Sequence, residues 1–102
     1  MNGKFKFYSV MEITMNDILQ DTTNLESAGN VLYNNIKDAI SRKEHISINM
    51  NGVTSLPSIL LNVSLGRIID ENGKESLKDF VIFRQITKQQ ALRLKDYMTR
   101  YK

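Results

Sequence analysis

Long helical stripes alternate along this chain with short strand-like runs. Within residues 21–43, apolar side chains recur at spacings of three and four, which places them on one face of a helix. The residues of this stripe are Leu25, Ala28, Leu32, Ile36 and Ala39. Thr23 and Glu26 have the spacing of a capping box, so we expect the helix to begin there.

Gly29 lies inside this predicted helix. Glycine in a helix interior costs roughly 0.5–1 kcal/mol relative to alanine, so we expect something to pack closely against its backbone. A neighbouring helix or strand is one interpretation. A bound ligand is the other.

Residues 45–51 alternate strictly between apolar and polar side chains, which is typical of a strand with one covered face. The apolar set is Ile46, Ile48 and Met50, and the polar set is Ser47, Asn49 and Asn51. Residues 4–14 also alternate, with a change of phase near Ser9 and Val10 that predicts a bulge or two short strands paired as a hairpin. Residues 80–86 form a further strand-like run.

Apolar residues surround the segment 56–69 on most sides, which predicts a largely buried helix. Pro57 suits the first turn of that helix because the missing N–H would have no partner there. Gly73 is placed to take a positive φ just after the helix ends. We expect residues 74–79 to form a single helical turn at most.

A second capping box, at Thr87 and Gln90, opens the last predicted helix. Its apolar stripe is Ala91, Leu94, Met98 and Tyr101. The resulting order of one or two strands, helix, strand, helix, strand and helix favours an α/β layer with parallel strands joined by right-handed crossovers. At 102 residues the chain fits one domain, spanning residues 1–102.

Composition narrows the class of protein. Hydrophobic residues make up 41% and charged residues 25%, as in ordinary folded domains. The lack of cysteine excludes disulfides, thiolate catalysis and cysteine-ligated zinc. Neither a signal-peptide core nor a membrane span is visible, so we expect a cytoplasmic protein without membrane contact. Basic residues gather at 4–6 and in the last helix, but the net charge is only +3, so nucleic acid is not the expected partner.

Candidate chemistry centres on Ser55 and Ser58, at the entrance of the buried helix. We rank helix capping, worth about 1 kcal/mol, ahead of phosphorylation for these serines. A serine nucleophile needs a base within hydrogen-bond reach, whereas His45 lies at the other end of the preceding strand. The acids at 70, 71, 75 and 79 lack the ligand spacing of a calcium loop. We expect no catalytic residue, no metal site and no cofactor.

The order and spacing of several short segments resemble the STAS-like family of small bacterial domains, relatives of the STAS domains in anti-anti-sigma factors and anion transporters. The resemblance covers about residues 25–98. It rests on the Gly-x-x-Leu of residues 29–32, the strand INMNGV of residues 48–53, the Ser58-containing helix that runs to Gly66, and the tail ENGKESLKDFVIFRQIT of residues 71–87.

This resemblance implies a mixed sheet of about four strands with helices packed mainly on one face, and reversible protein–protein contact rather than catalysis. In regulatory STAS domains a serine at this helix start is phosphorylated by a partner of the histidine-kinase-like ATPase superfamily, which makes such an ATPase a candidate partner here. Ser58 is then the candidate phosphorylation site, although the position aligned with the family's acceptor is Ile59. Asn49 stands where the family strand has an acidic residue.

We therefore expect a regulatory interaction module whose contact region runs from residue 51 to residue 62. The candidate partner-binding residues are Asn49, Asn51, Thr54, Ser55, Ser58 and Asn62. Two alternatives stay open. One is a sensor of a small ligand or nucleotide near Gly29 and Gly52, and the other is a phage or mobile-element protein that antagonises a host complex through its basic last helix.

Overall fold

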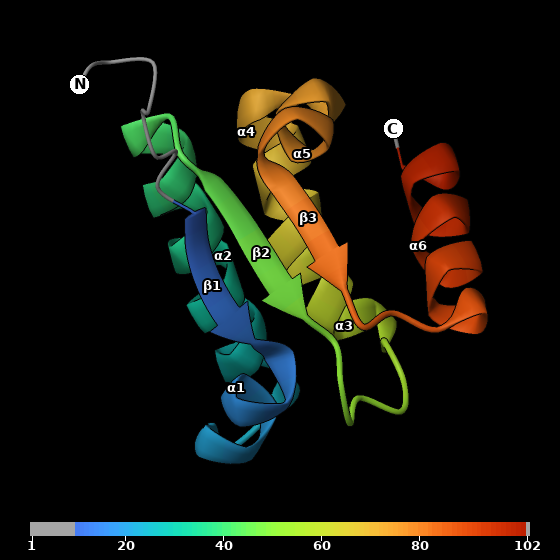
Figure 1. The fold of residues 1–102 in the computed structure, drawn as a ribbon. Coiled ribbons are helices and arrows are strands. Elements are labelled where there is room, and N and C mark those ends of the chain that lie inside the picture. Colours follow the sequence, from blue (N-terminus) through green and yellow to red (C-terminus); the bar gives the residue numbers. More distant parts are fainter. Residues whose placement is uncertain (1–9, 102) are drawn as a thin grey trace.

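Three parallel strands form the sheet, in the order β1-β2-β3 (Figure 1). The structure, a computed structural model, describes residues 10–101. Its strands are β1 (Val10–Thr14), β2 (His45–Asn49) and β3 (Val81–Arg84). Its helices are α1 (Met15–Asp21), α2 (Leu25–Arg42), α3 (Ser58–Leu61), the π-helical turn η2 (Asn62–Gly66), α4 (Arg67–Asn72), α5 (Lys74–Phe80) and α6 (Lys88–Arg100).

The strand pairing builds one continuous apolar face. On it, Ile46 pairs with Met11 and Val81, and Ile48 pairs with Ile13 and Phe83. Ile46 and Ile48 are fully buried, and so is Met50 just beyond the strand. The alternation predicted for residues 45–51 is therefore confirmed for its apolar set.

Both crossover connections lie on that apolar face. When the strand order equals the chain order and each crossover is right-handed, successive connections fall on the same side of the sheet. Figure 1 shows α2 and the α3–α5 segment behind the sheet, with α6 beside β3. The expected α/β architecture is thus observed, with its connecting helices on one face.

The sheet itself differs from the expectation of about four mixed strands. Within residues 10–101 it has three strands, and both pairings are parallel. The predicted strand at residues 4–14 is observed only as β1, because residues 4–9 lie outside the described part of the chain.

The helix α2 confirms the predicted stripe, but its N-cap lies one residue later than predicted. Asn24 is the N-cap, and its side chain accepts a hydrogen bond of 2.8 Å from the Ser27 N–H. Asparagine caps at least as well as threonine, so the capping box predicted for Thr23 and Glu26 is wrong. The stripe residues Ala28, Leu32, Ile36 and Ala39 are all buried.

Gly29 packs against a neighbouring helix and not against a strand. This agrees with the first of the two interpretations given for it. A Cβ added at Gly29 would lie 2.8 Å from the Cβ of Val63 and 3.2 Å from the carbonyl oxygen of Leu60. The glycine therefore lets α2 and the central helix approach more closely than any side chain would allow.

That central helix runs from Ser58 to Asn72 as α3, η2 and α4, with helical dihedrals at both junctions. Pro57 is its N-cap rather than a residue of its first turn. Gly73 follows α4 with a positive φ of +88°, as predicted, but its ψ of 159° is not that of the expected left-handed helical cap. The π-helical turn was not foreseen, because a hydrophobic pattern that covers most sides of a helix does not mark where its winding changes.

Two short helices also depart from expectation. The helix α1 was not predicted, and α5 has seven residues instead of a single turn. Each buries few side chains, namely Met15 and Ile18 in α1 and Leu77 in α5. Such short amphipathic segments carry too few periodic positions to stand out in the sequence.

The last helix, α6, opens with the capping box predicted for Thr87 and Gln90. Its predicted stripe is confirmed for Leu94, which is buried, and for Met98 and Tyr101, which pack partly buried against the core. Ala91 is exposed instead, and Gln90 and Tyr97 are buried beside Leu94. Within residues 10–101, no helix combines the length and the apolar character needed to cross a membrane.

Candidate functional site

A groove of about 760 Å³ lies between the loop that follows β2 and the beginning of α6. We call it the loop–α6 groove. Residues 53–57 of the loop form one wall, and residues 87–90 together with Arg93 form the other. It lies beyond the carboxyl end of β2, the end of a parallel sheet where α/β proteins commonly bind their ligands.

Two side chains of α6 hold the loop in place. The Nε2 of Gln90 donates a hydrogen bond of 2.6 Å to the carbonyl of Val53, and the Nε of Arg93 donates one of 3.1 Å to the carbonyl of Leu56. Gln90 also accepts a hydrogen bond from the Thr87 N–H through its Oε1. Both the oxygen and the nitrogen of this buried amide thus have partners. Gln90, which completes the capping box of α6, therefore also anchors the loop.

The loop begins with a tight turn that positions its first residues. The Asn49 side chain accepts a hydrogen bond of 2.8 Å from the Asn51 N–H, as asparagine does in turns. Gly52 follows with a φ of +83°, a conformation that other residues rarely adopt. The Val53 N–H then donates to the carbonyl of Met50 at 3.1 Å, which closes the turn.

The capping role predicted for Ser55 and Ser58 is wrong. The N-cap is Pro57, which has no side-chain hydrogen bond to give, and Ser58 is already the first residue of α3. The Ser58 hydroxyl instead accepts a hydrogen bond of 3.1 Å from Nη2 of Arg93. Ser55 is exposed on the loop, where it lines the groove.

The six predicted partner-binding residues divide between four places. Thr54 and Ser55 line the loop–α6 groove, and Ser58 adjoins it through Arg93. Asn51 is exposed at the turn. Asn49 lines a hollow of about 460 Å³ on the other face of the sheet, and Asn62 accepts a hydrogen bond of 2.8 Å from the Tyr97 hydroxyl.

That other face of the sheet carries the polar set of the strands. Arg84 of β3 lies over β2, where its Nε donates a hydrogen bond of 2.9 Å to the Ser47 hydroxyl. Ser47 is only 2% exposed. The predicted polar face is therefore present, but its central residue is covered rather than open to a partner.

The sequence did not identify Gln90 and Arg93 as site residues. They supply the groove with its hydrogen bonds, and Arg93 and Lys88 supply its positive charge. A signal was available, because polar or aromatic residues recur along α6 at spacings of three and four. These residues are Gln90, Arg93, Tyr97 and Tyr101.

This polar stripe also joins α6 to the central helix. Tyr97 donates to Asn62, and Tyr101 donates to the Asp70 carboxylate at 3.0 Å. Gly66 lies between the two tyrosines, and a Cβ there would come within 2.7 Å of the Tyr97 hydroxyl oxygen. Burial, reinforced by Tyr101 and Asp70, raises the pKa of Tyr97 to about 12, so its hydroxyl keeps its proton at neutral pH.

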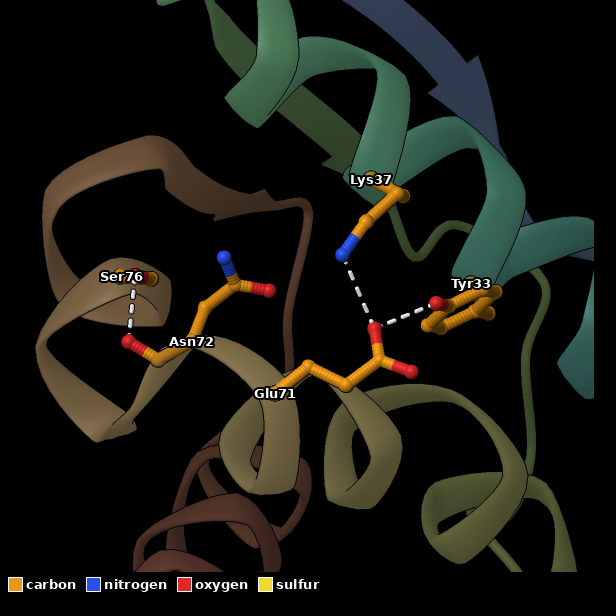
Figure 2. Close-up of polar contacts among 5 residues, drawn as sticks. All are labelled: Tyr33, Lys37, Glu71, Asn72 and Ser76. Atoms are coloured by element: carbon orange, nitrogen blue, oxygen red, sulfur yellow. Dashed lines mark hydrogen bonds and ion pairs between the residues drawn. The ribbon is translucent and has the colours of Figure 1, made fainter.

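A different polar cluster joins α2 to α4 (Figure 2). Glu71 accepts hydrogen bonds from the Tyr33 hydroxyl at 2.5 Å and from the Lys37 amine at 3.0 Å. The hydrogen bond from Tyr33, and after it the one from Lys37, hold the pKa of Glu71 below its ordinary value. Arg67 stacks over the Tyr33 ring at 3.7 Å and donates to Asn30. Each of these polar side chains has at least one partner within the protein, so the cluster is best explained as a tie between the helices.

The acidic residues near the end of the central helix have separate partners. Asp70 accepts from Tyr101, Glu71 accepts from Tyr33 and Lys37, and Glu75 pairs with Lys78 at 3.6 Å. Carboxylates held in different directions do not converge on a cation. In residues 10–101, no group of three or more acidic or histidine side chains is arranged to hold a metal ion.

Comparison with known proteins adds no relative. A scan against protein-family models, a search of curated proteins and a search of solved structures all return no match for this chain.

Proposed function

We propose that this chain is a non-enzymatic interaction module of the STAS-like type, which regulates a partner protein that it binds at the loop–α6 groove. The observation that carries the proposal is the position of Arg93. Its guanidinium bonds both to the loop backbone at Leu56 and to the hydroxyl of Ser58. One side chain thus couples the shape of the exposed loop to the state of a surface serine.

The groove has features that suit protein binding. Its loop is tied to α6 through Val53 and Leu56, so less conformational freedom is lost when a partner binds. Thr54 and Ser55 offer exposed hydroxyls at the rim. Ile59, next to Ser58, is 47% exposed, which adds an apolar contact to a polar rim as protein interfaces do.

Ser58 is the proposed phosphorylation site. A phosphate would add about −1.5 to −2 charges at pH 7, at an oxygen that already lies 3.1 Å from Arg93. Arginine binds phosphate through two parallel hydrogen bonds, so the phosphate would compete with the Leu56 carbonyl for the same guanidinium. Phosphorylation would then change both the charge of the groove and the restraint on its loop.

The resemblance to STAS-like domains supplies the partner to test first, a histidine-kinase-like ATPase from the same organism. Calorimetric titration should show that the chain binds this ATPase, and that Ser58→Glu weakens the complex by about tenfold or more, roughly 1.4 kcal/mol. Arg93→Ala should weaken it as well, because the loop loses its tie.

Ser41→Glu is the matched control, since Ser41 is an exposed serine of α2 that lies before β2, at the opposite end of the sheet from the groove. It should bind as the unmodified chain does. The proposed surface is wrong if Ser58→Glu and Arg93→Ala both leave the complex intact, or if Ser41→Glu disrupts it equally. Circular dichroism of each variant separates loss of binding from loss of fold.

A further inference from the structure

A second cleft lies on the opposite side of α6 from the loop–α6 groove, where α6 faces α5 and β3. Its deep part is an apolar hollow of about 180 Å³. Its outer part is a hollow of about 450 Å³. The two hollows share Lys78 and Met98, so they are adjoining parts of one feature, which we call the α5–α6 cleft.

The deep hollow exists because α6 does not close over β3. Val81 and Phe83 point to the helical face of the sheet, yet both are only half-buried, whereas their partners Ile46 and Ile48 on β2 are fully buried. On α6, Leu94 and Met98 form the opposite wall. A well-packed interior leaves few voids larger than a water molecule, so this hollow is room that the chain's own side chains do not fill.

Lysine side chains surround the mouth of the cleft. Lys74 and Lys78 come from α5, and Lys95 comes from α6. Among residues 10–101, the only ion pair these three amines form is between Lys78 and Glu75, at 3.6 Å and largely exposed. Three positive charges from two helices therefore converge beside an apolar hollow with little compensation.

From this arrangement we infer that the α5–α6 cleft binds a small amphipathic carboxylate, with its apolar tail in the deep hollow and its carboxylate at the lysines. The hollow has about the volume of an apolar cavity that holds benzene, which suits a medium-length alkyl chain or a single aromatic ring. The charge at the mouth selects an anion over a neutral or cationic molecule with the same tail. This site is separate from the loop–α6 groove, so it does not depend on the proposed function.

Octanoate is the probe, because it combines an eight-carbon chain with one carboxylate. Calorimetric titration of the full chain should show saturable one-to-one binding of octanoate below its micelle concentration. Octylammonium, which has the same tail and the opposite charge, should bind about tenfold more weakly or not at all. Equal binding of the two ligands, or no saturable binding of octanoate, would overturn the inference.

Charge reversal locates the headgroup. The double variant Lys74→Glu with Lys95→Glu should lose octanoate binding by about tenfold and should gain binding of octylammonium. A control with the same change in net charge is Lys43→Glu with Lys88→Glu, because both lysines are exposed and neither lines the cleft. If the control loses octanoate binding as much as the cleft variant does, the carboxylate binds elsewhere and the inference is wrong.

Filling the deep hollow locates the tail. Val81→Phe should weaken octanoate binding while the fold, followed by circular dichroism, is retained. Should this variant unfold, methyl NMR of the unmodified chain gives the same information, since octanoate should shift the signals of Leu77, Leu94 and Met98 and leave Leu32 of α2 unchanged. A second copy of the chain is the competing occupant of the cleft, and sedimentation tests for it. A dimer that persists with octanoate but dissociates in the lysine double variant would mean that a second copy fills the cleft.

Discussion

The central helix of this protein is packed in two different ways on its two flanks. On the α2 flank, Gly29 lets the backbone of α2 approach that of the central helix. The contact is with the Cβ of Val63, the side-chain atom next to the backbone. On the α6 flank, Gly66 instead receives the hydroxyl ends of Tyr97 and Tyr101. At these two glycines, the first flank makes a close apolar contact between backbones and the second receives the hydroxyl ends of long side chains.

The two flanks also differ in how completely their neighbours are buried. Close apolar packing on the α2 flank leaves Leu32 and Ile36 fully buried. On the α6 flank, the loop–α6 groove and the α5–α6 cleft both lie against α6. The α2 flank is the more closely packed of the two, and both surfaces that we propose for binding lie on the α6 flank.

The largest change in the free energy of unfolding is expected when one leucine is removed from each flank. Leu32→Ala should destabilise the protein by about 3–5 kcal/mol, because it creates a cavity among fully buried neighbours. Leu94→Ala should cost only about 2 kcal/mol, because Leu94 already borders a hollow. Urea unfolding of both variants measures the difference, and equal losses would show that the two flanks are packed alike.

An intermediate effect is expected from adding one methyl group to each glycine. Gly29→Ala should be destabilising by about 1–3 kcal/mol, since neither Val63 nor the Leu60 carbonyl can move away easily. Gly66→Ala should cost about 1 kcal/mol or less, because tyrosine hydroxyls can shift and alanine favours the helix. The combination Gly29→Ala with Val63→Ala should recover part of the loss in a double-mutant cycle. A greater cost at Gly66 than at Gly29 would reverse the comparison.

The smallest expected effect is the dependence of stability on pH. The pKa of Tyr97 is about 12 in the folded protein, against an ordinary value of 10.0. Between these values the unfolded chain releases this proton and the folded protein keeps it, so stability is fully present below about pH 10 and is lost as the pH rises through about 12. We expect a loss of roughly 1 kcal/mol from this group, less than the full shift would give, because the hydroxyl is only partly buried.

The variant Tyr97→Phe should remove that part of the alkaline loss in urea unfolding at about pH 9 and pH 12. At neutral pH it should lower stability by about 0.5–1 kcal/mol, through the lost hydrogen bond to Asn62. Tyr33→Phe is the matched variant on the α2 flank, where the pKa of Tyr33 is raised by its hydrogen bond to Glu71. An alkaline loss that is unchanged in Tyr97→Phe would place the titrating group elsewhere.

Local sequence patterns predicted much of the scaffold. The alternation of residues 45–51 and the stripe of α2 specify burial because side chains two residues apart on a strand, or three and four apart on a helix, share a face. The capping box of Thr87 and Gln90 is likewise a local arrangement, and it is present. The cap at Thr23 failed because Asn24, one residue later, offers an equally good oxygen.

The candidate site was less accessible to sequence analysis. Thr54, Ser55 and Ser58 were recognised as a surface group, but their partners Gln90 and Arg93 are more than thirty residues away in the chain. Asn62 is engaged by Tyr97, and Asn49 lines a different hollow. No local pattern brings such residues together, because the contact depends on how α6 docks on the central helix.

The sequence by itself determined the α/β class, the direction in which β2 faces and the start of the last helix, since each follows from the arrangement of neighbouring residues. Only the tertiary structure decided that Gly29 adjoins a helix rather than a ligand, that Ser58 faces Arg93 instead of capping α3, and that α6 leaves a cleft beside β3. These features depend on distances between elements far apart in the chain. At the central helix, for example, the close contacts come from a valine of that helix at Gly29 and from two tyrosines of α6 at Gly66.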